Sequence, residues 1–315
     1  MSWQKILRQN ITSLEELSAF IDLKFPEDKN FNFPINLPLR LAKKIEKGNP
    51  DDPILRQFVP SCKEKDIDPL YLADPVGDQQ ARCAPKNLKK YQQRMLILTT
   101  QACGMHCRYC FRQNFPYTKQ QGFVEEISQI KADKSLREVI LSGGDPLSLN
   151  DKLLNNLITD LSHIPHLKRL RFHTRFPIGI PERITPTFLQ ILSHCSLQIW
   201  FVIHSNHPRE LDSDVLKAVK SIQCMGIPVL NQSVLLHGVN DTIEVLQEHC
   251  EKLVDHGIQP YYLHQLDRIQ GARHFEVKKA KGLDLIKQLR EQISGYAVPA
   301  YVQEIANEKS KTLIN

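Results

Sequence analysis

Short strand-like apolar segments recur along most of this chain, and their spacing limits the folds that it can adopt. Each segment starts about thirty to forty residues after the previous one, the distance that a strand, a helix and their loops require. The six segments are 95–100, 138–144, 169–175, 197–204, 228–236 and 259–267. The apolar residues between them have helical spacing, as in Leu153, Leu154, Leu157, Ile158 and Leu161. Six βα units predict an α/β fold, with a parallel sheet curled into an open or partial (βα)6 barrel.

Two shorter segments flank this predicted barrel. Residues 1–88 predict an N-terminal, mainly helical or irregular extension, because prolines interrupt the helical pattern there. These prolines are Pro34, Pro38, Pro50, Pro53 and Pro60. We expect the barrel over 89–296, which leaves 297–315 as a short C-terminal segment.

The bulk composition disfavours several classes of protein. With 41% hydrophobic and 24% charged residues, the chain of 315 residues is typical of globular proteins. No apolar run approaches the roughly 18 residues of a membrane span, and the N-terminus lacks the apolar core of a signal peptide. We therefore expect a cytoplasmic protein without a membrane segment. The net charge of +6 comes without a long basic block, so nucleic-acid binding has little support.

Polar residues follow the predicted strands at the points where these strands end. In a βα barrel the carboxyl ends of all strands open onto one face, where active sites are assembled. Residues far apart in the sequence should therefore converge on that face. They are Cys103, Cys107, Cys110, Gly143, Gly144, Asp145, Thr174, Arg175, His204, Asn206 and Asp267.

Three of the eight cysteines lie within eight residues, in the segment CGMHCRYCFR. Thiolates suit iron–sulfur clusters and zinc. Cys103, Cys107 and Cys110 can hold three irons of a [4Fe–4S] cluster, which leaves the fourth iron open for the amino and carboxylate groups of S-adenosylmethionine. The alternatives are a zinc knuckle or three incidental cysteines. Zinc normally takes four ligands, often from paired CxxC units, and His106 is a poor fourth ligand.

The spacing CxxxCxxC, with Tyr109 before the last cysteine, resembles the radical S-adenosylmethionine superfamily. The segment LSGGDPL (141–147) resembles the glycine-rich element that follows the second strand in that superfamily. The resemblance implies that Gly143, Gly144 and Asp145 bind S-adenosylmethionine, because glycines without a Cβ let the backbone approach its methionine amino group.

A longer resemblance, from about Gly48 to Lys311, is to the lysine 2,3-aminomutase family. The segments similar to this family are 48–60, 74–78, 204–211 and 231–241. Three further segments are similar to its bacterial branch that makes (R)-β-lysine for translation elongation factor P, namely 111–117, 261–275 and 294–312. Enzymes of this family use pyridoxal phosphate beside the iron–sulfur cluster.

The family resemblance assigns roles to residues near the C-terminus and near the cysteines. Members hold pyridoxal phosphate on a lysine twelve residues after a Val-Pro pair, and that count leads here to Lys311. Asp267 and Glu304 match two acidic positions that bind the ε-ammonium of substrate lysine, by charge and by directed hydrogen bonds. Arg112 matches an arginine that receives the substrate carboxylate in a bidentate fork.

Three further residues are implied as cofactor contacts. Arg94, nine residues before Cys103, matches another arginine of the family site, and we expect it to contact a phosphate or a carboxylate. Gln232 and Ser233, in the segment 231–241, are implied as cofactor-binding residues.

The resemblance thus implies an intramolecular aminotransferase that converts free L-lysine to (R)-β-lysine. Its expected partners are an electron donor such as flavodoxin or ferredoxin, and, through its product, elongation factor P and the ligase that attaches β-lysine. Two alternatives stay within radical chemistry: an aminomutase for another amino acid, and a radical enzyme without pyridoxal phosphate. A non-catalytic metal module that binds the translation machinery is the third alternative, but such a module needs no converging polar site.

Overall fold

The computed structural model describes residues 1–25, 31 and 33–315. Within these residues the chain forms a nine-stranded sheet whose strands follow one another in chain order, so that β1 and β9 are its open edges. Strands β2 to β8 are parallel to their neighbours, and the two edge strands are antiparallel. The strands are β1 (Asn87–Leu88), β2 (Arg94–Thr100), β3 (Glu138–Gly143), β4 (Arg169–Thr174), β5 (Gln198–His204), β6 (Val229–Val234), β7 (Gln259–His264), β8 (Ala300–Gln303) and β9 (Thr312–Leu313).

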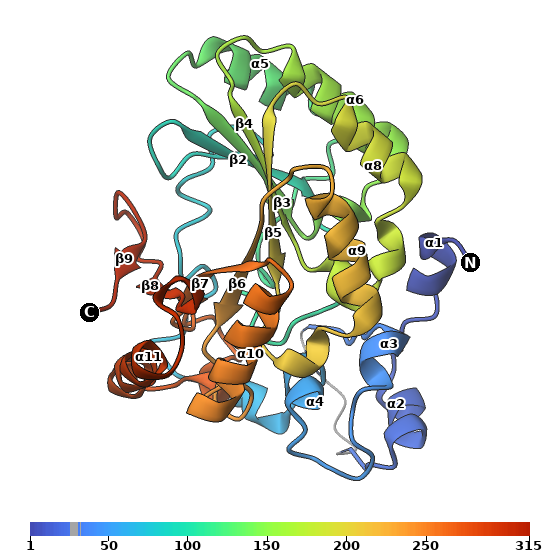
Figure 1. Cartoon of the computed structure of the whole chain (residues 1–315), viewed down its shortest axis with the longest axis vertical. Helices are drawn as coiled ribbons and strands as arrows, with labels where there is room; N and C mark the ends of the chain where they lie inside the picture. Colours follow the sequence, from blue (N-terminus) through green and yellow to red (C-terminus); the bar gives the residue numbers. More distant parts are fainter. Residues whose placement is uncertain (26–30, 32) are drawn as a thin grey trace.

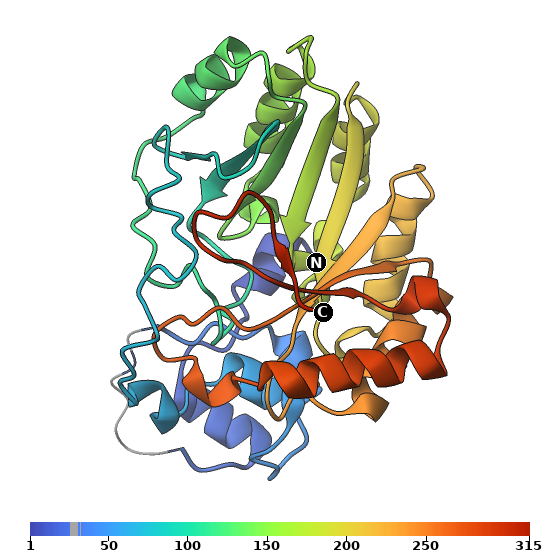
Figure 2. The same cartoon turned by 90° about the vertical axis from the view of Figure 1, so that its left-hand side faces the viewer.

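Helices alternate with the parallel strands and cover the outer face of the sheet (Figure 1). The helices are α1 (Trp3–Leu7), α2 (Leu14–Ile21), α3 (Leu39–Ala42), α4 (Pro53–Phe58), α5 (Val124–Ala132), α6 (Asp151–Ser162), α7 (Phe176–Gly179), α8 (Pro186–Ser193), α9 (Ser213–Gln223), α10 (Ile243–Asp255) and α11 (Lys279–Gln292). The N-terminal helices α1 to α4 gather at one end of the sheet (Figure 2). No helix in the described part of the chain combines the length and the apolar composition that crossing a bilayer requires.

The predicted α/β fold is confirmed, and the six predicted strands correspond to β2 through β7. The sheet is larger than six strands, because both flanking segments contribute to it. Strand β1 comes from the segment 1–88, and β8 and β9 come from 297–315. Strands of two to four residues carry too few side chains for a periodic pattern, so the sequence did not predict them.

Helix α6 shows how local sequence signals produce the outer layer. The side chain of Asn150 accepts a hydrogen bond of 2.9 Å from the backbone N–H of Leu153, which caps the N-terminus of the helix. Four apolar residues then recur at helical spacing and are buried, namely Leu154, Leu157, Ile158 and Leu161. The helix therefore packs one apolar stripe against the sheet and leaves its polar face to solvent.

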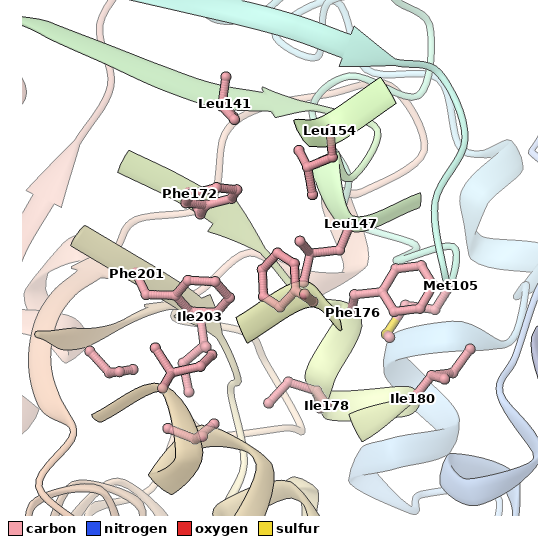
Figure 3. Packing of buried hydrophobic residues seen from close by; sticks show 14 of the residues in the cluster. Met105, Leu141, Leu147, Leu154, Phe172, Phe176, Ile178, Ile180, Phe201 and Ile203 are labelled. Atoms are coloured by element: carbon pink, nitrogen blue, oxygen red, sulfur yellow. The ribbon is translucent and has the colours of Figure 1, made fainter. Parts of the chain in front are cut away.

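The two faces of the sheet differ in polarity because side chains alternate along each strand. On the outer face, Leu141, Phe172 and Phe201 come from three adjacent strands and pack under the helices (Figure 3). The rings of Phe172 and Phe201 are stacked with 5.6 Å between their centroids. Fully burying a side chain of this size contributes about 1.5–3 kcal/mol. The inner face of β4 instead presents Arg171 and His173 to a cavity.

Candidate active site

A cavity of about 350 Å³ lies on the inner face of the sheet, toward the carboxyl ends of the strands. Cys103, Cys107 and Cys110 line it, and all three thiols are free. Burial raises the pKa of Cys110 to about 11, and the neighbouring Cys107 adds to the rise. Thiols in such surroundings become thiolates when a metal supplies positive charge. The predicted convergence of the cysteines with other strand-end residues is therefore found in the structure.

The zinc alternative would require a fourth ligand beside the three cysteines. Within the part of the chain that the structure describes, no group of three or more His, Cys, Asp or Glu side chains is placed to hold one metal ion. A four-iron cube carries its thiolates on separate corners, whereas a zinc ion draws its ligands around one centre. His106, the possible fourth ligand of a zinc ion, instead has its Nδ1 2.9 Å from the carbonyl oxygen of Pro34.

The N-terminal extension holds the cysteine loop in place. Asn10 Nδ2 donates a hydrogen bond of 2.8 Å to the carbonyl of Gly104, and Asn36 Nδ2 donates one of 3.2 Å to the carbonyl of Cys103. Asn10 and Asn36 are also hydrogen-bonded to each other at 2.6 Å. A Cβ at Gly104 would lie 2.9 Å from the ring of Phe176, so the loop packs closely against the start of α7. The extension is therefore part of the cluster-binding architecture.

Gly143 ends β3 at the wall of the cavity, and Gly144 follows it. Gly143 has a φ of +120°, and a Cβ there would lie 2.7 Å from the carbonyl oxygen of Thr100. A Cβ at Gly144 would lie 2.6 Å from the carbonyl oxygen of Gln101 and would also collide with that of Ala102. The sequence predicted that the missing Cβ atoms make room for a ligand. The structure adds a second reason for glycine at both positions, because the end of β2 and the start of the cysteine loop occupy the space of the Cβ atoms.

Asp145 also lines the cavity, but its carboxylate is committed to protein groups. It accepts hydrogen bonds of 2.7 Å from the Thr174 hydroxyl and from the backbone N–H of Arg175, and one of 3.0 Å from the backbone N–H of Phe176. A fourth, of 3.0 Å, comes from the backbone N–H of Leu147. The Asp145 side chain therefore joins the ends of β3 and β4.

The two residues predicted on β6 point to opposite faces of the sheet. Gln232, predicted as a cofactor contact, lines the cavity. Ser233 is buried on the other face, where its hydroxyl donates a hydrogen bond of 2.8 Å to the carbonyl of Ser205 and accepts one of 2.9 Å from Asn231 Nδ2. The side chain of Ser233 is therefore separated from the cavity by the sheet itself.

Arg112 lines the cavity and is held by an acidic residue that the sequence analysis did not single out. Arg112 Nε donates a hydrogen bond of 2.6 Å to Asp78 Oδ2, and Arg112 Nη1 donates one of 3.2 Å to Ser142 Oγ. Lys90 Nζ lies 2.7 Å from Asp78 Oδ1. Burial alone would raise the pKa of Asp78, but the charges of Arg112 and Lys90 hold it below its ordinary value. An ionised Asp78 thus fixes two cations at one wall of the cavity.

Lys311 reaches the same cavity from the C-terminal segment, which crosses in front of the sheet in Figure 2. Pairing of β8 with β9 turns the chain back, so that Lys311 Nζ lies 2.6 Å from Glu304 Oε2. Glu304 Oε1 accepts a hydrogen bond of 2.6 Å from the Tyr91 hydroxyl and lies 3.5 Å from Lys90 Nζ. Burial would raise the pKa of Glu304, but the charge of Lys311 and these hydrogen bonds lower it.

Asp267 is the acidic residue of this cavity whose carboxylate has no committed partner. It follows β7 and faces the cavity, and within the described residues no side-chain hydrogen bond or ion pair engages it. Burial raises the pKa of Asp267 to about 7, against the charge of Lys311, which lowers it. This carboxylate is therefore available to a cationic ligand.

The remaining residues of the inner face complete the polar lining. Arg94, predicted to contact a phosphate or a carboxylate, lines the cavity, and its guanidinium lies over the ring of Tyr91, 4.7 Å from the centroid. His173, His204 and His264 also line it, and burial holds the pKa values of all three below the ordinary range, that of His204 at about 3. Neutral imidazoles can donate or accept a hydrogen bond without adding charge. All three histidines lie near the carboxyl ends of predicted strands, which is the sequence feature that indicates a place in the cavity. The sequence analysis named only His204.

Known proteins are similar to this chain in sequence and in fold. Residues 93–172 match the family model of a 4Fe-4S single cluster domain. A protein of Escherichia coli named L-lysine 2,3-aminomutase is 42% identical, over 98% of this chain and 93% of its own length. A protein of Haemophilus influenzae with the same name is 40% identical, over 99% and 95%. One of Clostridium subterminale is 33% identical, over 98% and 77%.

Two solved structures have a similar fold at low sequence identity. Streptococcus suis SuiB, bound to the precursor peptide SuiA, superimposes with a TM-score of 0.53 at 15% identity, over 68% of this chain and 49% of SuiB. A radical SAM methyltransferase from Sphaerobacter thermophilus gives 0.50 at 15% identity, over 69% and 68%. These two likenesses show the fold alone. The sequence relatives, which align over almost the whole chain, show that the protein belongs to the lysine 2,3-aminomutase family of radical S-adenosylmethionine enzymes.

Proposed function

We propose that this chain is an L-lysine 2,3-aminomutase that converts free L-lysine to (R)-β-lysine. One observation carries the proposal. A single cavity brings together three cysteine thiols, an arginine fixed by a buried aspartate, the Lys311 amine, and the carboxylates of Glu304 and Asp267, of which that of Asp267 is uncommitted. A zwitterionic amino acid with a second ammonium group matches this distribution of charges.

The residues of the cavity fit the cofactors of this family. The three half-buried thiols suit a [4Fe–4S] cluster, and the Lys311 amine on the same cavity suits covalent attachment of pyridoxal phosphate. The volume of about 350 Å³ is within the range of small-molecule sites. When bound, the cluster with S-adenosylmethionine supplies a carbon-centred radical that removes a hydrogen atom, and pyridoxal phosphate carries the nitrogen that migrates.

The chain's own residues bind and orient the substrate. Arg112, held by Asp78, presents its guanidinium to the substrate carboxylate. At the other end, the uncommitted carboxylate of Asp267 attracts the ε-ammonium. Glu304 is engaged with Lys311 in this structure, and it becomes available as a second acceptor when Lys311 no longer carries an ammonium charge. Fixing both ends of lysine places its Cβ in one position, which radical chemistry at a single carbon requires.

The role of Asp78 can be tested with Asp78→Asn. We expect the KM for lysine to rise about tenfold, a loss of about 1.4 kcal/mol in binding, because Arg112 loses the charge that holds its guanidinium. The free energy of unfolding should also fall, because two half-buried cations lose their shared, fully buried partner. Steady-state kinetics and denaturant unfolding measure these changes. Asp212→Asn, which weakens an ion pair with Lys44 outside the cavity, is the control and should leave KM unchanged.

Substrate binding should depend on pH through Asp267. With a pKa of about 7, its carboxyl group is ionised and attracts the ammonium above that pH, and it loses this charge as the pH falls through 7. We expect the KM for lysine to rise roughly tenfold between about pH 8 and about pH 6. Asp267→Asn should have a higher KM that no longer changes over this range. A KM that stays constant with pH in the unaltered enzyme would contradict the role of Asp267.

The proposed activity is tested by an anaerobic assay. The reconstituted protein is incubated with L-lysine, S-adenosylmethionine, pyridoxal phosphate and dithionite, and β-lysine is separated on a chiral column. We expect (R)-β-lysine from lysine and no product from glutamate. If S-adenosylmethionine is cleaved but no β-lysine forms, the assignment to radical chemistry is supported and the assignment of lysine as the substrate is contradicted. Product formed equally well without pyridoxal phosphate would reject that cofactor.

The biological setting of the reaction is a further part of the proposal. We infer that the product serves the modification of elongation factor P by its lysylating ligase, and that flavodoxin or ferredoxin supplies electrons in the cytoplasm. The support is the resemblance of 111–117, 261–275 and 294–312 to the bacterial branch with this role. A strain that lacks the gene for this chain should contain elongation factor P without β-lysine, measured by intact-protein mass spectrometry.

A further inference from the structure

A buried arginine donates directly to one of the three cysteines. Arg175 follows β4 and is 7% exposed. Its Nη1 lies 2.8 Å from Cys107 Sγ and also donates to the Tyr109 hydroxyl. Its Nη2 donates hydrogen bonds of 2.7 Å to Gln57 Oε1 and 2.8 Å to Glu210 Oε2. The planar guanidinium thus connects two residues of the cysteine loop, Cys107 and Tyr109, to Gln57 and Glu210 from other parts of the fold.

The counter-charge of Arg175 is buried more completely. Glu210 is 0% exposed, and its Oε1 accepts hydrogen bonds of 3.0 Å from Gln57 Nε2 and from the backbone N–H of Asn206. Asn206 Nδ2 in turn donates hydrogen bonds to Gln57 Oε1 at 3.0 Å and to the Tyr109 hydroxyl at 2.6 Å. Every member of this network is therefore fixed by at least two partners.

The contribution of the Arg175–Glu210 ion pair to the stability of the fold does not explain why it lies beside Cys107. Burying two charges costs desolvation energy that their attraction often does not recover, and apolar replacements of such pairs are often neutral or stabilising. An N–H donor and a positive charge at a cysteine that binds an iron–sulfur cluster have a definite effect, however. One-electron reduction makes the cluster more negative, so these groups favour the reduced state and raise the reduction potential.

We propose that Arg175 is a positioning residue that orients Cys107 and raises the reduction potential of the cluster, and that Glu210 limits this rise as its counter-charge. The proposal rests on the cluster of the proposed function. The reaction concerned is the uptake of one electron by the cluster from a low-potential donor protein, or from dithionite in the experiment. Arg175 and Glu210 neither gain nor lose a proton or an electron in this step.

The test compares midpoint potentials in the full chain, reconstituted anaerobically and titrated with dithionite, with the reduced cluster followed by electron paramagnetic resonance. Arg175→Gln should decrease the ratio of reduced to oxidised cluster at a fixed potential at least tenfold, a shift of ~59 mV toward more negative values. Glu210→Gln should shift the potential in the opposite direction, because Arg175 then lacks its counter-charge. The double variant should lie between the two.

A matched control separates this effect from general disturbance of the core. Arg183 is also fully buried and donates a hydrogen bond of 2.8 Å to the carbonyl of Leu147, but it contacts none of the three cysteines. Arg183→Gln should leave the midpoint potential unchanged. If Arg175→Gln fails to fold, Glu210→Gln decides the question alone, since it keeps the guanidinium in place.

The outcomes distinguish this inference from the proposed function. Equal potentials in the unaltered protein, Arg175→Gln and Glu210→Gln, each with four irons bound, would overturn the role of the ion pair. Shifts of both variants in the same direction would overturn it as well. An unaltered protein that binds no cluster would instead reject the proposed function.

Discussion

Replacing Cys107 with alanine is expected to remove the cluster and the activity together. The variant retains two of the three thiols that line the cavity, which is too few to hold a cube with one open iron. Iron and acid-labile sulfide should fall from about four of each per chain to near zero. Electron paramagnetic resonance of the reduced protein should show no cluster signal, and β-lysine should not form.

The control for this prediction is Cys195→Ala. Cys195 is half-buried like the three cysteines of the site, but it packs against the outer apolar core. This variant should retain iron, sulfide and activity. A Cys107→Ala protein that retains its iron and its activity would show that Cys107 is not a ligand.

Replacing Lys311 with alanine is expected to abolish activity while leaving the cluster intact. The amine that would attach pyridoxal phosphate is lost, and Glu304 loses a partner at 2.6 Å. We expect kcat to fall by at least about 10³-fold, the scale on which essential catalytic groups act. Borohydride reduction followed by peptide mass spectrometry should find the reduced cofactor on Lys311 in the unaltered enzyme. The same treatment should find none in the variant, although its iron content is unchanged.

Two further variants separate covalent attachment from charge. Lys311→Arg keeps a cation beside Glu304 but cannot attach the cofactor covalently, and we expect it to be as inactive as the alanine variant. Lys309→Ala removes an exposed lysine two residues away and should retain full activity. Activity in Lys311→Arg would assign Lys311 to the ion pair alone, and an inactive Lys309→Ala would indicate a general effect on the C-terminal segment.

The sequence predicted most of the cavity because its residues follow a simple geometric rule. Residues at the carboxyl ends of parallel strands meet on one face, so Cys103, Gly143 and Asp267 could be placed together without coordinates. The position of Lys311 came from the family resemblance. A lysine four residues before the end of the printed sequence carries no such signal by itself.

Other parts of the site depended on contacts that no local pattern specifies. Asp78 lies in a loop, and its pairing with Arg112 and Lys90 joins segments that are 34 and 12 positions away from it. Asp145 was predicted as a cofactor contact, and its carboxylate accepts hydrogen bonds from the Thr174 hydroxyl and from backbone N–H groups after β4. A role assigned to one residue from the sequence does not predict such long-range hydrogen bonds. Their partners depend on the register between neighbouring strands, which only the folded chain defines.

The sequence by itself determined the fold class, the cysteine motif and the order of the strands that carry the site. These properties follow from the periodicity and spacing of residues, which can be read from the sequence alone. Only the tertiary structure decided which side of the sheet each residue faces and which charges are already paired. Gln232 and Ser233 are adjacent in sequence yet lie on opposite faces. Glu304 and Asp267 are both acidic and line the same cavity, yet only Asp267 is uncommitted, because the C-terminal hairpin brings Lys311 to Glu304.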